Sequence, residues 1–177
     1  MKLIILDRDG TINEDSDKHI KSPQEWKPIR GSLEAIGRLV QEGYRIVVAT
    51  NQSGIARGLL DTKTLFSIHD TLQRAANQVG GRVDAFFFCP HAADSGCMCR
   101  KPQPGMLVEA TRRFNVAAKD SYMVGDAQRD LEAAAAAGVR PVLVLTGKGK
   151  QTRDAGGLPR GTEIAADLAA IAARLAP

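Results

Sequence analysis

The feature that most constrains the fold is a regular alternation of short apolar runs with longer amphipathic segments. Mostly apolar residues form short runs at 3–6, 45–49, 85–89, 122–124 and 142–145, and such runs are typical of strands buried on both faces. Apolar residues recur at helical spacing in the segments between them, at 32–40, 62–79, 104–114 and 128–137. This alternation predicts an α/β fold, with a mostly parallel sheet covered by helices on both faces.

The predicted boundaries depend on capping and breaking residues. Ser32 and Thr62 are expected to cap their helices, and Pro104 to lie in the first turn of the next helix. Residues 147–161, rich in Gly, Lys and Arg, are predicted to form a loop. Residues 164–175 carry apolar side chains at helical spacing, and the first of them could instead form a short edge strand.

Length and composition limit the class of protein. A chain of 177 residues suits one domain with a substantial core, so we expect a single domain over residues 1–177. The net charge of +4 suits an anionic ligand, and the lack of a Lys/Arg run argues against a nucleic-acid partner. No apolar stretch approaches the ~20 residues of a membrane span, and the N-terminal run is too short for a signal peptide. We expect a cytoplasmic, monomeric protein that binds neither nucleic acid nor membrane.

The first apolar run ends in two carboxylates one residue apart, Asp7 and Asp9, followed by Gly10. Side chains alternate along a strand, so the two carboxylates point the same way if the strand geometry persists. Two negative charges held this close are unfavourable unless a cation lies between them, and a divalent metal with an anionic substrate would supply it. The ordinary alternative is a pair of solvated loop aspartates.

Three further polar motifs follow three further predicted strands. They are Thr50-Asn51-Gln52-Ser53-Gly54, then Arg100-Lys101-Pro102-Gln103-Pro104-Gly105, then Gly125-Asp126 with Asp130. Each has an ordinary interpretation by itself: a turn, a solvated basic pair and a helix N-cap. In parallel sheets ligands bind outside the carboxyl ends of the strands, so four motifs there predict one active site.

In this combination the chain resembles the haloacid dehalogenase superfamily of phosphotransferases. The resemblance implies a Rossmann-like core and a phosphatase that needs Mg²⁺. It makes Asp7 the nucleophile, through an aspartyl-phosphate, and Asp9 the general acid and base, while Thr50 and Lys101 stabilise the phosphoryl oxygens. The gaps between the motifs are filled by predicted core elements, so we expect no separate cap domain. Specificity should then reside in loops 13–30, 54–61 and 89–101.

The same resemblance implies the magnesium ligands. They are the Asp7 carboxylate, the Asp9 backbone carbonyl and Asp126, and Asp130 is expected to fix the loop or water geometry behind them.

A cluster of soft ligands lies between the third and fourth predicted strands. Cys89, His91, Cys97 and Cys99 provide four ligands within eleven residues, and they include all three cysteines of the chain. A closed Cys₃His site is typical of structural Zn²⁺, which makes 89–99 a predicted zinc loop. Iron would also suit the thiolates, and a buried free thiol is an alternative for Cys89. Zinc here would hold the loop that carries Lys101.

This arrangement is similar to one branch of the superfamily, the heptose bisphosphate phosphatases and their histidinol-phosphatase relatives. Residues 51–58 and 99–106 carry the closest resemblance. It implies a substrate-binding set of Asp15, Ser16, Asp17, Lys18, Thr50, Asn51, Gln52, Ser53, Arg57, Arg100 and Lys101. The branch commonly has Gly-Tyr where this chain has Asp17-Lys18. It often has Lys at the position of Ala127, which leaves open whether Arg129 or another base replaces that charge.

The leading hypothesis is removal of the 7-phosphate from heptose 1,7-bisphosphate, which leaves the 1-phosphate for nucleotide-heptose synthesis and the lipopolysaccharide core. The partner would be a small phosphorylated sugar. A histidinol-phosphate phosphatase is the close alternative, although a selective site for histidinol would want an acid facing the substrate. A zinc-stabilised binding module without turnover is the alternative from another class.

Overall fold

A six-stranded parallel sheet forms the centre of the molecule. The computed structural model describes residues 2–177, and the strand order in its sheet is β3-β2-β1-β4-β5-β6. The strands are β1 (Lys2–Leu6), β2 (Tyr44–Asn51), β3 (Ala85–Cys89), β4 (Ser121–Gly125), β5 (Arg140–Val144) and β6 (Glu163–Ala165). Every neighbouring pair is parallel, which confirms the predicted fold class.

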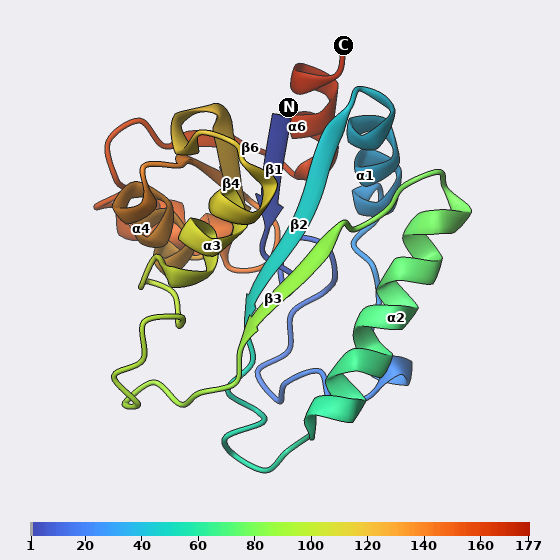
Figure 1. The fold of residues 1–177 in the computed structure, drawn as a ribbon, viewed down its shortest axis with the longest axis vertical. Helices are drawn as coiled ribbons and strands as arrows, with labels where there is room; N and C mark the ends of the chain where they lie inside the picture. The colour runs from blue at the N-terminus through green and yellow to red at the C-terminus, as the bar shows by residue number, and fades with distance from the viewer. Residues whose placement is uncertain (1) are drawn as a thin grey trace.

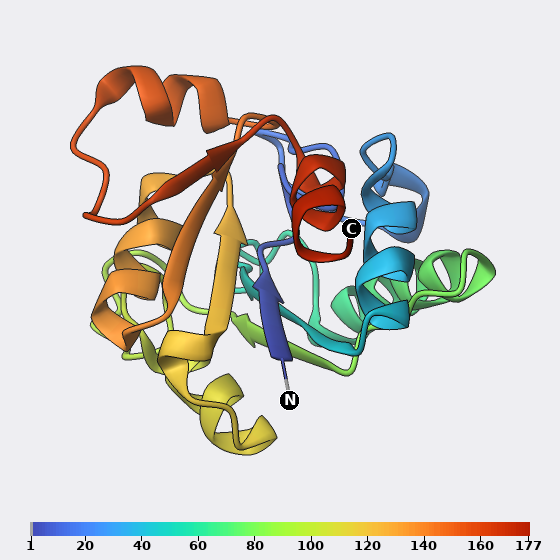
Figure 2. The ribbon, with the colours of Figure 1, turned by 90° about the horizontal axis from the view of Figure 1, so that it is seen from above.

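Helices cover both faces of this sheet (Figure 1). The helices are α1 (Ser32–Gln41), α2 (Thr62–Gln78), α3 (Gly105–Phe114), α4 (Gln128–Ala137), α5 (Gly149–Ala155) and α6 (Leu168–Leu175), with short 3₁₀ turns at Pro23–Glu25 and Ala118–Asp120. Helices α1, α2 and α6 lie on one face and α3 and α4 on the other, and Figure 2 shows the twisted sheet between these layers. Each connection between successive strands of residues 2–177 contains one α-helix.

The alternating side chains of the central strands build a separate apolar cluster on each face. In β1, Ile4 and Leu6 contact the cluster that includes residues of α1, α2 and α6. Leu3 and Ile5 point the other way, toward the cluster that includes residues of α3 and α4. All four side chains are fully buried, so β1 has no solvent-exposed face over these residues.

Three details of the predicted secondary structure were wrong. Ser32 is not an N-cap, because its hydroxyl donates to the carbonyl of Ile12 and Gly31 occupies the cap position. Asp61, not Thr62, caps α2 through a 2.7 Å hydrogen bond from the Thr64 backbone. The predicted loop 147–161 contains α5, which the sequence hides because the helix has no apolar stripe.

The topology brings the polar motifs to one edge of the sheet. Strand β1 lies between β2 and β4, so the chain order reverses on either side of it. This switch point is where parallel sheets bind ligands, outside the carboxyl ends of the strands. The residues that follow β1, β2 and β4 therefore meet there. No helix of residues 2–177 is long and apolar enough to cross a membrane.

Candidate active site

A polar pocket of about 240 Å³ opens at this edge of the sheet. Its lining comes from the segment after β1 (Asp7 and Asp9), from loop 13–30 (Asp15, Ser16, Asp17, His19 and Ile20), from residues 50–53 at the end of β2, and from Arg100, Arg129 and Lys148. The structure thus brings together residues that are far apart in the sequence, and most of the predicted substrate-binding set lies in this one pocket.

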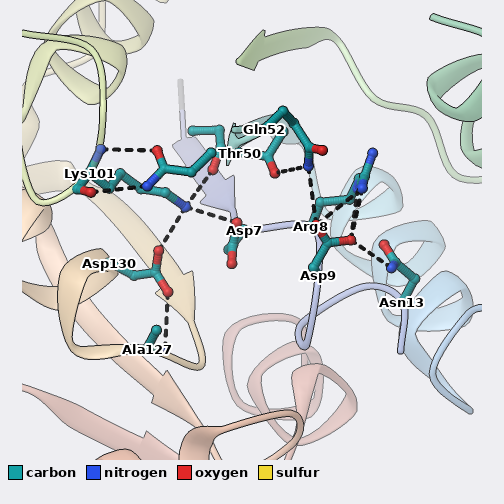
Figure 3. A network of polar contacts seen from close by, with 11 residues as sticks. Asp7, Arg8, Asp9, Asn13, Thr50, Gln52, Lys101, Ala127 and Asp130 are labelled. Carbon is teal, nitrogen blue, oxygen red and sulfur yellow. Dashed lines mark hydrogen bonds and ion pairs between the residues drawn. The ribbon is translucent and has the colours of Figure 1, made fainter. Parts of the chain in front are cut away.

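Asp7 and Lys101 form the buried centre of the site (Figure 3). The Lys101 ammonium donates to Asp7 Oδ1 at 2.8 Å and to the Ala49 carbonyl at 2.7 Å, and it lies 2.7 Å from Asp130 Oδ1. Burial would lower the pKa of Lys101, but Asp130 and Asp7 outweigh it and raise this pKa. Lys101 is therefore a permanent cation beside the predicted nucleophile. Asp130, predicted to fix loop or water geometry, pairs directly with Lys101 and also accepts a 3.0 Å hydrogen bond from the Ala127 N–H of the loop after β4.

The backbone at Gly10 and at Gly147 lies directly against the Asp126 side chain. Its Oδ2 accepts a 2.8 Å hydrogen bond from the Lys148 backbone N–H, while its Oδ1 is buried without a partner. A Cβ on Gly10 would lie 2.0 Å from Asp126 Oδ2, and one on Gly147 would lie 2.2 Å from it. Both positions also have a positive φ, so each requires glycine for two reasons: the backbone conformation and the lack of room for a Cβ.

The carboxylates of this site fit a divalent cation. One oxygen each from Asp7, Asp126 and Asp130 lies within 4.8 Å of the others. Burial, partly offset by Lys101, raises the pKa of Asp7 to about 6, and burial together with Asp7 raises the pKa of Asp126 to about 7. A cation bound between them would lower both pKa values and favour the ionised forms. Carboxylate oxygens are the ligands that Mg²⁺ prefers, and the free Oδ1 of Asp126 is one of them.

Asp9 is held in place by donors on both carboxylate oxygens (Figure 3). Arg8 donates to Oδ1 at 3.0 Å and to Oδ2 at 3.1 Å, Asn13 donates to Oδ1 at 2.9 Å, and Gln52 donates to Oδ2 at 3.1 Å. Burial would raise the pKa of Asp9, but the Arg8 charge and the hydrogen bonds from Asn13 and Gln52 lower it below its usual value. The free protein therefore keeps Asp9 ionised.

The turn after β2 organises the site as well as lining it. The Asn51 side chain accepts from the Lys101 N–H and donates to the Lys101 carbonyl, both at 3.0 Å. Gln52 donates to the Thr50 hydroxyl oxygen at 2.8 Å. Thr50 and Ser53 line the pocket that contains Asp7. Asn51 and Gln52, predicted to contact substrate, thus also position Lys101 and Asp9.

The predicted specificity loops contribute unequally. Residues 15–17 line the pocket, and Lys148 lies 3.4 Å from Asp15 and 3.6 Å from Asp17. Loop 54–61 provides no lining residue, so Arg57 lies outside the pocket, and Lys18 borders a neighbouring hollow instead.

Three cations of the site were not assigned by the sequence. Arg8 is fully buried and pairs with Asp9, although it stands between two predicted catalytic residues. Lys148 comes from the segment predicted as a loop. Arg129 was considered only as a replacement for a missing base, and the structure places it in the pocket wall. The only sequence signal that could have indicated these three cations is their position close to the ends of predicted strands.

The predicted zinc ligands converge beside this pocket. The Cys89 sulfur lies 3.2 Å from the Cys99 sulfur and 3.7 Å from the Cys97 sulfur, and His91 Nδ1 lies 3.3–3.4 Å from Cys99 and Cys89. The edge of a tetrahedron with Zn–S bonds of about 2.3 Å is about 3.8 Å, so the set fits one ion. Burial raises the pKa of Cys89 to about 12, so a thiolate there needs a cation.

Comparisons with known proteins agree with this site. A family model described as HAD-hydrolase-like matches residues 98–171. The D-glycero-beta-D-manno-heptose-1,7-bisphosphate 7-phosphatase of Bordetella bronchiseptica is 57% identical over 175 residues, which cover 99% of this chain and 98% of that protein. The protein of the same name from Pseudomonas putida is 50% identical over 175 residues, which cover 99% of each.

A solved structure extends the similarity to the whole fold. The crystal structure of D,D-heptose 1,7-bisphosphate phosphatase from B. bronchiseptica, complexed with magnesium and phosphate, has a TM-score of 0.97 at 57% identity. The match covers 99% of this chain and 98% of that one. Sequence identity, coverage and fold together show that this chain belongs to the D-glycero-beta-D-manno-heptose-1,7-bisphosphate 7-phosphatase family of HAD-like hydrolases.

Proposed function

We propose that the protein is a magnesium-dependent phosphatase that removes the 7-phosphate of D-glycero-beta-D-manno-heptose 1,7-bisphosphate. The observation that carries this proposal is the buried Asp7–Lys101 pair beside Asp9, in a chain 57% identical to a relative that bears this name. The products are heptose 1-phosphate and inorganic phosphate. We infer that the 1-phosphate feeds nucleotide-heptose synthesis for lipopolysaccharide in the cytoplasm.

Asp7 is the proposed nucleophile. Its carboxylate attacks phosphorus, the bond from phosphorus to the sugar oxygen breaks, and an aspartyl-phosphate forms. Attack by water then breaks the bond between phosphorus and the Asp7 oxygen and releases phosphate. The 2.8 Å contact with Lys101 orients the attacking carboxylate. Two easier displacements replace one direct hydrolysis, which is extremely slow in water.

Asp9 is the proposed proton carrier for both steps. It donates a proton to the departing sugar oxygen and later takes one from the attacking water. The Arg8, Asn13 and Gln52 contacts hold the carboxyl group at a fixed place in the pocket. Because these contacts lower the pKa of Asp9, the substrate dianion must raise it again for the first proton transfer.

The remaining charges of the site stabilise the phosphoryl oxygens. Lys101 and the Thr50 hydroxyl are the proposed protein donors to them. The residues proposed to hold Mg²⁺ are Asp7, Asp126 and the Asp9 backbone carbonyl. Bound there, Mg²⁺ would neutralise the carboxylates and orient the phosphoryl group. Asp130 keeps Lys101 in place through a second ion pair at 2.7 Å.

The Cys₃His cluster is proposed to hold a structural Zn²⁺. Cys99 directly precedes Arg100 and Lys101, so an ion there would fix the backbone that presents both cations. All four ligands belong to the protein, which leaves no open position for chemistry.

The charges of the pocket favour a bisphosphate over histidinol phosphate. Histidinol carries an ammonium group, and a selective site would offer it a free carboxylate. Asp15 and Asp17 line the pocket, but both lie within 4 Å of the Lys148 ammonium, which offsets one of their two negative charges. Arg100 and Arg129 in the same wall suit a second phosphate instead.

The test compares phosphate release from heptose 1,7-bisphosphate and from histidinol phosphate, with Mg²⁺ and with EDTA. The bisphosphate should be turned over with a kcat/KM at least about 100-fold higher, and ³¹P NMR should show the 1-phosphate as product. Asp7→Asn should abolish turnover, whereas Asp154→Asn, an exposed carboxylate in α5, should leave it unchanged. Equal turnover of histidinol phosphate would refute the substrate, and an active Asp7→Asn protein would refute the mechanism.

A further inference from the structure

The cations around the pocket differ in whether a protein group already neutralises them. Three basic residues line it: Arg100, Arg129 and Lys148. The Lys148 ammonium lies within 4 Å of Asp15 and Asp17, and its backbone N–H binds Asp126. This lysine therefore balances charges of the protein itself.

The Arg100 guanidinium has a weaker anchor. Its Nη1 donates to the His91 carbonyl at 3.4 Å, which ties the side chain to the zinc loop but leaves its charge uncompensated. Arg100 lines both the catalytic pocket and an adjoining pocket formed by residues 93–103. It therefore stands at the border between the two.

Arg129 occupies the same border without any partner. It too lines both pockets. Among residues 2–177 its guanidinium forms no ion pair, and its Nε is buried with no hydrogen-bond partner. Removing a charged donor from water without pairing it is unfavourable, so this arrangement suits a site completed by an anionic ligand.

We propose that Arg129, together with Arg100, binds the phosphate of the substrate that is not hydrolysed, which makes Arg129 a specificity-determining residue. The inference rests on the proposed function, because only a bisphosphate brings a second phosphate into the pocket. Two guanidinium groups at one border provide planar pairs of donors, which match the oxygen geometry of a phosphate better than an ammonium does. The acids of the site pair directly with Lys148 and Lys101, whereas Asp130, Asp7, Asp126 and Asp15 act on Arg129 only from beyond ion-pair distance. The two guanidinium groups are therefore the cations of the pocket wall that can still pair directly with a ligand.

Position in the chain supports this role. Arg129 directly precedes Asp130, the partner of Lys101, and follows Asp126 by three residues. It is thus fixed to the same strand–helix connection as the catalytic acids, yet its side chain faces the zinc loop. A second phosphate held there would orient the sugar while the reacting phosphate meets Asp7.

The test measures kcat/KM for heptose 1,7-bisphosphate and for heptose 7-phosphate, which lacks the second phosphate. For Arg129→Gln, the ratio of the two values should fall about 10- to 100-fold, mostly through a higher KM for the bisphosphate. Arg129→Lys should restore part of the ratio. Arg153→Gln, which changes an exposed arginine outside the pocket, should leave the ratio as in the wild type.

Binding of heptose 1-phosphate, measured by calorimetry with Mg²⁺, tests the same contact without turnover. The Kd should rise about 10- to 100-fold in Arg129→Gln. A ratio and a Kd within about twofold of the wild type would overturn the proposal, as would an equal fall in kcat/KM for both substrates. A wild-type protein that binds heptose 1-phosphate through Arg129 but releases no phosphate would refute the proposed function alone.

Discussion

Replacing Asp126 by asparagine should stabilise the metal-free protein while it destroys activity. Asp126 is 1% exposed, one of its oxygens has no partner, and burial next to Asp7 raises its pKa to about 7. In the absence of a metal ion, the folded protein at pH 8 must therefore keep an unfavourable charge at this position. Asparagine has nearly the same shape, and its carbonyl oxygen still accepts from the Lys148 N–H.

The magnitude follows from the difference between the folded and unfolded pKa of Asp126. A rise from 3.8 to about 7 corresponds to about 4 kcal/mol at 1.36 kcal/mol per pKa unit. Asp7 and Asp126 share this unfavourable energy, and the new amide group needs a partner of its own. We therefore expect a net gain of about 2–4 kcal/mol, or about 5–15 °C in Tm for a domain of this size.

The stability difference between Asp126→Asn and the wild type should depend on pH. Below pH ~4 the carboxyl is protonated in both the folded and the unfolded wild type, so the variant gains nothing. As the pH rises from 3.8 to about 7, the unfolded state ionises while the folded state keeps its proton, which destabilises the wild type. The advantage of Asp126→Asn should grow over this window and then stay constant.

The assay is thermal unfolding in EDTA at several pH values, repeated with Mg²⁺. Magnesium should raise the Tm of the wild type and have little effect on Asp126→Asn, because the variant lacks one of the proposed ligands. Asp154→Asn, in the exposed part of α5, is the matched control and should show neither effect. A variant that melts at or below the wild type in EDTA at pH 8 would refute the reasoning.

The other predictions test the lysine, the glycine contact and the thiolate cluster. Lys101→Met should lower kcat/KM by at least about 100-fold in steady-state assays, since it removes the cation beside the nucleophile; near-normal turnover would contradict this. Gly147→Ala should raise the Mg²⁺ concentration for half-maximal activity about 10-fold, because its Cβ would displace Asp126. The control is Gly157→Ala, since Gly157 also has a positive φ but no atom near the position of a Cβ. Equal effects of the two substitutions would exclude the contact with Asp126 as the cause. Cys97→Ser should reduce bound zinc, measured by mass spectrometry, together with the Tm; unchanged zinc content would rule out the predicted site.

The elements with a clear pattern of apolar residues could be predicted from the sequence. The strand segments 3–6 and 46–49 are apolar throughout, and α2 has a clear apolar stripe. Helix α5 could not be predicted this way, because it is polar and depends on tertiary contacts. The Thr152 hydroxyl donates to the Asp126 carbonyl, and Gly149 packs so closely on Val144 that a Cβ would lie 1.7 Å from its carbonyl oxygen.

The sequence by itself determined the chemistry of this protein. Acids, a hydroxyl and a lysine at successive strand ends predicted one active site, since a parallel sheet gathers its carboxyl ends at one edge, and the resemblance of these motifs to the haloacid dehalogenase superfamily implied phosphoryl transfer. Only the tertiary structure decided which charges pair: Asp130 with Lys101, Arg8 with Asp9, and Arg129 with none within residues 2–177. The physical reason is that an ion pair depends on distances of a few ångströms between side chains of different elements. Strand register and helix packing set those distances, and no local pattern records them.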